Sequence, residues 1–182
     1  SAPAQTTETK VDWNPIRASK SLISFSMGNP ELRYSVLAIS YFWAIAAILS
    51  VQFIPLAKNV LLADKQVAAV LLVAFSAGIA IGSVSINALL KGDISARYSA
   101  RSVLVLGVLL IAFYGLCRMW DLTPSGELFT VWEFLAQPLA LVLTFNLLLI
   151  AVAGGMFVVP LYAFLTTFVD KSQTARTVAA TT

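Results

Sequence analysis

The chain has 182 residues, of which 59% are hydrophobic and 12% are charged, and its mean hydropathy is +0.85. A soluble domain carries about a quarter charged residues, so this composition argues against a soluble fold and for an integral membrane protein. One Cys and no His argue against an intrachain disulfide, a metal site and His-based catalysis, and we expect neither a cofactor nor a catalytic residue. The net charge of +3 is better explained by membrane topology than by nucleic-acid binding.

Residues 1–29 are polar and rich in Ser and Thr, and they become weakly amphipathic toward Phe25. We predict a cytoplasmic linker that ends either in an interfacial segment or in a disordered lead-in. No basic region followed by a short apolar core begins the chain, so no signal peptide is expected. The lack of an initiator Met and the polar, Thr-rich ends favour a fragment of a longer protein.

Residues 30–182 are predicted to form an all-α, polytopic membrane segment with four transmembrane helices. A helix rises 1.5 Å per residue, so about 20 apolar residues cross the roughly 30 Å hydrocarbon core of a bilayer. The predicted spans are about 34–57, 67–90, 101–120 and 138–165, and no charged residue interrupts their centres. The third span reaches the required length only if its flanks lie at the membrane interfaces.

The first helix is predicted to begin at Asn29-Pro30-Glu31 and to run to Pro55. Asn is a favoured N-cap, Pro suits the first helical position, and a carboxylate is stabilised at the positive end of the helix dipole. Gln52 is polar and lies close to the helix end. It either lines a cavity or lies near the outer membrane interface.

The second helix contains Gly78 and Gly82, four residues apart and therefore on one face. Small residues let two membrane helices approach closely, so this face is predicted to pack against a neighbouring helix. The alternative is that the same face lines a substrate path.

Lys and Arg concentrate in cytoplasmic loops of membrane proteins. Nine of the twelve basic residues lie before the first span, between the second and third spans, or after the fourth, and three lie in the other two loops. This distribution predicts that both termini are cytoplasmic. The loop between the second and third spans contains Asp93, Arg97 and Arg101, which we interpret as a topology signal or a functional cytoplasmic loop.

The third helix is predicted to end at Trp120, acting as an interface anchor. The segment from Phe129 to Phe134 is predicted to form a short interfacial helix, and Pro138 to begin the fourth span. In that span, Gly154, Gly155 and Pro160 predict a kink, because Pro lacks a backbone donor and Gly weakens a helix. Interrupted helices often line the moving surface of transporters.

Asn146 lies deep in the fourth span, and it either bridges helices or contacts a substrate.

Two stretches resemble one branch of the major facilitator superfamily. The first is FIPLAKNVLLADKQVAAVLLVAFSAGIAIGS, and the second is GGMFVVPLYAFLTTFVDKSQTARTVAATT. Both are similar to the lysophospholipid transporter branch, including versions fused to an acyltransferase. The loop KGDISAR is a degenerate form of the basic Gly-Asp-Arg loop motif of the superfamily. The resemblance covers about residues 30–182 and implies helices seven to ten, from the C-terminal half of a major-facilitator-type bundle. The family's first six helices are missing, and the chain stops where helix eleven should begin.

This resemblance implies a secondary transporter in the cell inner membrane that moves lysophospholipid or a related amphiphile by alternating access. Candidates for contacts along the substrate path are Gln52, Asn146 and Tyr162. The implied partners are membrane lipid, the remaining helices of the same transporter, and a fused or associated acyltransferase outside this segment.

Two other classes of function stay open. A four-helix scaffold or assembly subunit fits the small-residue face, the Trp anchors and the absence of charge within the spans. An enzyme acting on lipid is disfavoured, because its only candidate carboxylates, Asp93, Asp121, Glu127 and Glu133, have no His to pair with.

Overall fold

The computed structural model describes residues 27–90, 97–124 and 126–181, and it describes side chains within 27–89, 101–124 and 126–167. The described elements are helical, and one isolated pair of bridged residues links two loops. In chain order they are α2 (Pro30–Pro55), the π-helical turn η1 (Leu56–Val60), α3 (Lys65–Leu90), α4 (Arg97–Arg118), α5 (Val131–Leu135) and α6 (Pro138–Thr181).

Four of these helices are long and apolar enough to cross a membrane. They are Pro30–Val60, Lys65–Leu89, Arg101–Arg118 and Pro138–Thr167. The prediction of an all-α, polytopic membrane protein with four spans is therefore confirmed. Asn29 caps α2 as predicted: its Oδ1 accepts a hydrogen bond from the backbone N–H of Glu31 at 3.1 Å, and α2 ends at Pro55.

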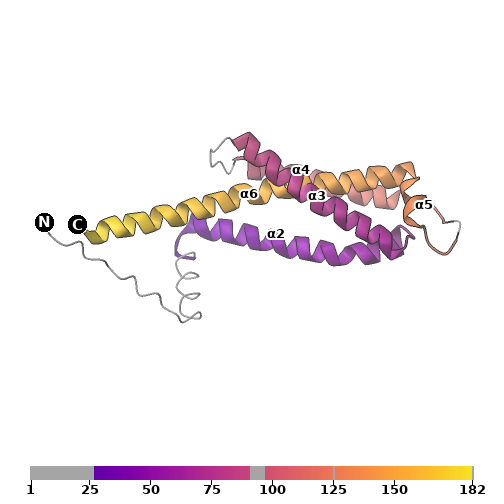
Figure 1. The fold of residues 1–182 in the computed structure, drawn as a ribbon, viewed down its shortest axis with the longest axis horizontal. Helices are drawn as coiled ribbons and strands as arrows, with labels where there is room; N and C mark the ends of the chain where they lie inside the picture. Colours follow the sequence, from indigo (N-terminus) through magenta and orange to yellow (C-terminus); the bar gives the residue numbers. More distant parts are fainter. Residues whose placement is uncertain (1–26, 91–96, 125, 182) are drawn as a thin grey trace.

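The long helix α6 is the centre of the bundle, because α2, α3 and α4 all pack against it. Figure 1 shows that the start of α2, the end of α3 and the start of α4 lie toward one end of the bundle, and that η1 and α5 lie at the other. This is the arrangement of four successive spans that alternate in direction.

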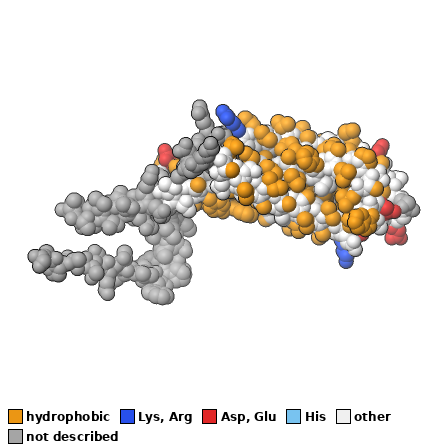
Figure 2. All heavy atoms as spheres, turned by 45° about the horizontal axis from the view of Figure 1, so that its top comes forward, with side chains coloured by type: hydrophobic (Ala, Val, Ile, Leu, Met, Phe, Trp, Pro, Cys, Tyr) orange, Lys and Arg blue, Asp and Glu red, His pale blue; other side chains and the backbone are white. Residues whose placement is uncertain are grey.

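Large apolar side chains cover the outside of the bundle. Val51, Leu104 and Ile111 are each more than 70% exposed, and Figure 2 shows hydrophobic side chains over much of the described part of the visible face. Acidic side chains gather at the end that carries α5 (Figure 2). In water such a surface would be unfavourable, whereas in a bilayer it faces hydrocarbon.

Helices α3 and α6 meet along a seam of small residues. A Cβ added at Gly78 would lie 2.5 Å from the carbonyl oxygen of Leu148, and one added at Gly82 would overlap the carbonyl of Val152. From the opposite side, a Cβ at Gly155 would lie 2.5 Å from the carbonyl oxygen of Ile79. The backbones approach this closely because the three positions carry no side chain, and close approach supplies the dispersion contacts that hold membrane helices together.

The segments at the α5 end, residues 56–65, 119–124 and 126–137, contact one another, and we call them the cap. Phe129 pairs with the segment before α3: its N–H donates to the carbonyl of Leu62 at 2.7 Å, and its carbonyl accepts from the N–H of Asp64 at 3.0 Å. Leu62 has a φ of 50°, an uncommon left-handed conformation for a side chain of this size. Asp64 Oδ1 in turn accepts from the backbone N–H of Gln66 at 2.8 Å, capping α3.

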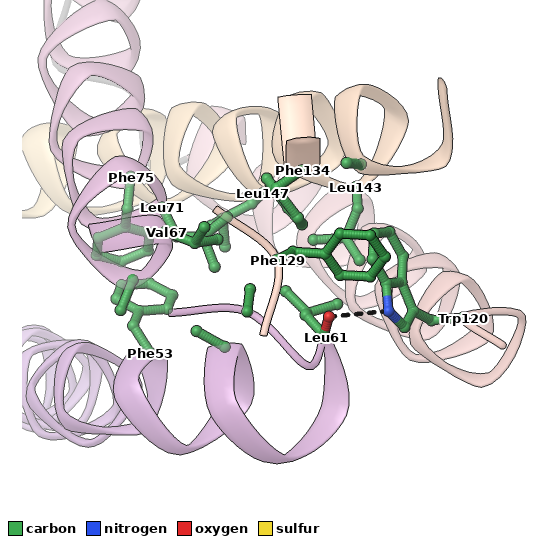
Figure 3. Close-up of a cluster of buried hydrophobic side chains, with 14 of the residues drawn as sticks. Phe53, Leu61, Val67, Leu71, Phe75, Trp120, Phe129, Phe134, Leu143 and Leu147 are labelled. Carbon is green, nitrogen blue, oxygen red and sulfur yellow. Dashed lines mark hydrogen bonds between the residues drawn. The ribbon is translucent and has the colours of Figure 1, made fainter. Parts of the chain in front are cut away.

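Trp120 differs from its prediction as an interface anchor. Helix α4 ends at Arg118, and Trp120 lies within the cap at 9% exposure, packed against Phe129 and Phe134. Figure 3 shows its indole nitrogen directed at the carbonyl oxygen of Leu61. The physical reason is that a buried indole needs an acceptor, and the turn after η1 provides one.

The fourth span is Pro138–Thr167, and the predicted kink at Gly154, Gly155 and Pro160 stays a prediction. The helix continues through Gly154, Gly155 and Pro160 without a break, and it extends beyond Leu165 to Thr181. Packing explains the continuity, because both glycines face neighbouring helices and Pro160 is among the fully buried residues. Tertiary contacts of this kind offset the low intrinsic helix propensity of Gly and Pro.

Candidate functional site

Within the described residues, a hollow lies between α2 and α4. Three adjoining hollows follow each other along this gap, with volumes of about 170, 390 and 590 Å³. Leu110 of α4 lines all three, and we call the whole feature the α2–α4 groove. Along the first two hollows α6 forms the floor through Leu147, Ile150, Ala151, Gly154 and Phe157.

The polarity of the groove changes along its length. The hollow nearest the start of α2 is lined by apolar and aromatic side chains, among them Tyr41, Phe42 and Phe157. The middle hollow adds Gln52 and Asn59, and the hollow at the cap end adds Cys117 and Arg118. The groove is therefore apolar at one end and carries amide groups and a cation at the other.

Gln52 and Asn59 line the same wall because they are seven residues apart on α2 and η1. Both are exposed into the middle hollow. Of the two interpretations of Gln52, its position supports the cavity-lining one. Sequence reasoning missed Asn59, although the seven-residue spacing from Gln52 is a signal that could have identified it.

Asn146 lies on α6 at 9% exposure. Its Oδ1 is buried and accepts no hydrogen bond from the described residues, and the same holds for the hydroxyl oxygen of Thr144 two residues earlier. A bridge from this oxygen to α2, α3 or α4 is thus not present within the described part of the chain. A buried acceptor without a hydrogen bond lowers the stability of the fold in an apolar environment.

Tyr162 lies on the α2 side of α6. Its hydroxyl oxygen accepts a hydrogen bond from Nε1 of Trp43 at 2.8 Å, which joins the two helices. Both side chains are more than 40% exposed. Sequence reasoning gave Trp43 no role, because a contact between residues 119 positions apart has no local signature.

The three candidate path residues do not form one site. Gln52 faces the α2–α4 groove, Asn146 is buried on α6 without lining the three hollows, and Tyr162 pairs with Trp43 outside them. Gly154 does line the apolar hollow, where a Cβ added to it would lie 3.0 Å from the ring of Phe42.

The remaining predicted residues lie away from the groove or outside the described residues. Arg101 is exposed on α4, at the end opposite Arg118. Arg97 begins α4, although its side chain lies outside the described set, and Asp93 lies wholly outside it. The Glu133 carboxylate is committed to a capping box with Thr130, accepting from its backbone N–H at 2.9 Å.

No family model, curated protein or solved structure matches this chain.

Proposed function

We propose that this chain is part of a secondary transporter that moves lysophospholipid or a related amphiphile across the cell inner membrane by alternating access. The observation that supports it is the α2–α4 groove, which is apolar along most of its length and polar at one end. Such a surface suits a molecule with a hydrocarbon chain and a polar head, because each part meets a matching environment. The resemblance of the sequence to the lysophospholipid transporter branch points to the same substrate class.

The described parts of the spans also fit this substrate. The side chains that line the groove within the membrane are apolar or uncharged until Arg118 at the end of α4. Transporters of small polar solutes commonly place ionisable groups at mid-membrane. An amphiphile needs few such contacts, since most of its surface is hydrocarbon.

Filling the groove tests the proposal. In the full-length polypeptide that contains these residues, reconstituted in liposomes, Leu110→Trp should slow the flipping of fluorescent lysophospholipid, because Leu110 lines all three hollows. The matched control is Ile111→Trp, since Ile111 follows it on the same helix at 73% exposure. Ile111→Trp should leave the rate unchanged.

The competing class of function gives a different result. A scaffold or assembly subunit would flip no lysophospholipid with the unaltered sequence, and neither substitution would matter. Equal rates for the unaltered protein and for Leu110→Trp would also contradict a path through the groove.

A further inference from the structure

The α2–α4 groove has two chemically different ends, which gives it a direction. The apolar hollow is the smallest of the three, at about 170 Å³, and the hollow at the cap end is the largest, at about 590 Å³. The small end is lined by aromatic and aliphatic side chains, and the large end presents Asn59, Cys117 and Arg118. A molecule with a narrow apolar part and a broader polar part matches this taper.

Arg118 supplies a positive charge that complements an anionic headgroup. It is the last residue of α4, exposed, and within the described chain it has no carboxylate as an ion-pair partner. A guanidinium stays charged and offers a fork of N–H donors that fits phosphate oxygens. Because α4 spans the membrane, its last residue lies at the depth where phosphates of membrane amphiphiles are found.

The walls of the groove provide further hydrogen-bond donors near the cap end. Asn59 lines both the middle hollow and the hollow at the cap end, and Gln52 lies one heptad before it. Their amides can bond the glycerol hydroxyl or ester oxygens of a lipid, which lie next to the phosphate. Beyond Gln52 the groove is apolar as far as Phe157.

We infer that the α2–α4 groove binds one single-chain anionic amphiphile, with its phosphate at Arg118 and Asn59 and its acyl chain running along α6 toward Gly154. This inference rests on the proposed function and adds the direction of the bound molecule and the residue that selects its charge. The smallness of the apolar hollow favours one chain over two, and the guanidinium favours an anion over an uncharged lipid.

Cys117 provides a probe at the predicted headgroup position. It is the single cysteine of these 182 residues and lines the hollow that contains Arg118. The experiment measures the rate at which a small maleimide alkylates it in the full-length polypeptide, held in phosphatidylcholine nanodiscs, with any cysteine elsewhere replaced by Ser. Lysophosphatidylglycerol should slow the reaction saturably. Monoacylglycerol, which lacks the phosphate, should need roughly tenfold higher concentration, since a hydrogen-bonded charge contributes about that factor.

Two matched variants locate the effect. Arg118→Gln should weaken protection by lysophosphatidylglycerol about tenfold, whereas Arg101→Gln, at the other end of α4, should not. Moving the thiol by two positions, with Met119→Cys in a Cys117→Ser background, should abolish protection, because Met119 is 65% exposed and does not line the groove.

Several results would overturn the inference. In the unaltered protein, lysophosphatidylglycerol could protect Cys117 no better than monoacylglycerol or no better than diacyl phosphatidylglycerol. Protection by lysophosphatidylglycerol could persist in Arg118→Gln. Cys117 could also resist alkylation before any amphiphile is added. The last would mean that another helix covers the groove. The comparison of the lipids uses the unaltered protein, so it still tests the inference if Arg118→Gln folds poorly. If lysophospholipid is still flipped in the transport assay, the proposed function stands and this site alone is lost.

Discussion

The indole nitrogen of Trp120 donates a hydrogen bond to the carbonyl oxygen of Leu61 at 3.1 Å, across 59 residues of sequence. The bond ties the turn after η1 to the end of α4, and Phe129 and Phe134 pack around it (Figure 3). The cap therefore fixes the ends of α2 and α4, which are the two walls of the groove, relative to each other.

Trp120→Phe should lower the stability of the protein. It removes the donor to a buried carbonyl, which costs on the order of 1–2 kcal/mol, and it reduces the aromatic packing of the cap. The measurement is the thermal unfolding midpoint in detergent. Trp132→Phe is the matched control, because Trp132 is 82% exposed, and it should leave the midpoint nearly unchanged. A Trp120→Phe protein as stable as the parent would show that the cap does not depend on this bond.

The α3–α6 seam gives the second prediction. Gly82→Leu would push the backbone of α6 away, at a cost on the order of 1–3 kcal/mol, by analogy with overpacked cores. Gly107→Leu on α4 is the control, because nothing lies within 4 Å of a Cβ added there. Thermal unfolding in detergent compares the two. If both substitutions have the same small effect, the seam contributes little to stability.

Local sequence signals predicted much of this fold. The Asn29-Pro30-Glu31 start, the end of α2 at Pro55 and the four spans depend on capping chemistry and hydrophobic length, which short windows of sequence reveal. The same is true of the short helix α5, which falls within the predicted segment from Phe129 to Phe134 apart from its last residue.

The features of the fold that the sequence did not predict depend on contacts between distant segments. Nothing near Trp120 in the sequence reveals that its acceptor is Leu61, and nothing near Tyr162 indicates Trp43. The sequence predicts Gly155 as part of a kink, and it does not reveal the close approach of this residue to the backbone of Ile79. The α2–α4 groove also has no local sequence signal, because it exists only where α2 and α4 lie on either side of α6.

The buried oxygen of Asn146 leads to the third prediction. Asn146→Leu removes an acceptor that has no partner among the described residues, so stability should be unchanged or rise by about 1 kcal/mol. The thermal unfolding midpoint of the full-length protein is the measurement, with Thr144→Val as a parallel case. A fall in the midpoint would mean that a further helix donates to this amide, and lost transport at unchanged stability would place Asn146 on the substrate path.

Membrane orientation is the fourth prediction, and it follows from the basic residues. In a Cys117→Ser background, a cysteine at Lys65 should react with an impermeant maleimide on intact cells, and one at Ser95 should react only after the cells are opened. Lys65 begins α3 at the cap end of the bundle, whereas Ser95 lies in the sequence between the end of α3 and the start of α4, and both of these helix ends are at the opposite end of the bundle. Labelling of Ser95→Cys on intact cells would reverse the orientation.

The last prediction separates packing from motion in α6. Gly155→Ala should destabilise the protein, because its Cβ would lie 2.5 Å from the backbone carbonyl of Ile79, which cannot easily move. Gly154→Ala meets the Phe42 ring at 3.0 Å, and a side chain can shift by a few tenths of an ångström. Pro160→Ala restores a backbone donor within the helix.

If α6 bends during alternating access, Gly154→Ala combined with Pro160→Ala stiffens the moving part without breaking the α3–α6 seam. The double variant should therefore keep the parent's unfolding midpoint, or exceed it, while flipping lysophospholipid more slowly in liposomes. Transport at the parent's rate would remove these two residues from the mechanism. A loss of stability equal to that of Gly155→Ala would assign all three positions to packing, and the slower transport would then follow from misfolding rather than from a stiffer helix.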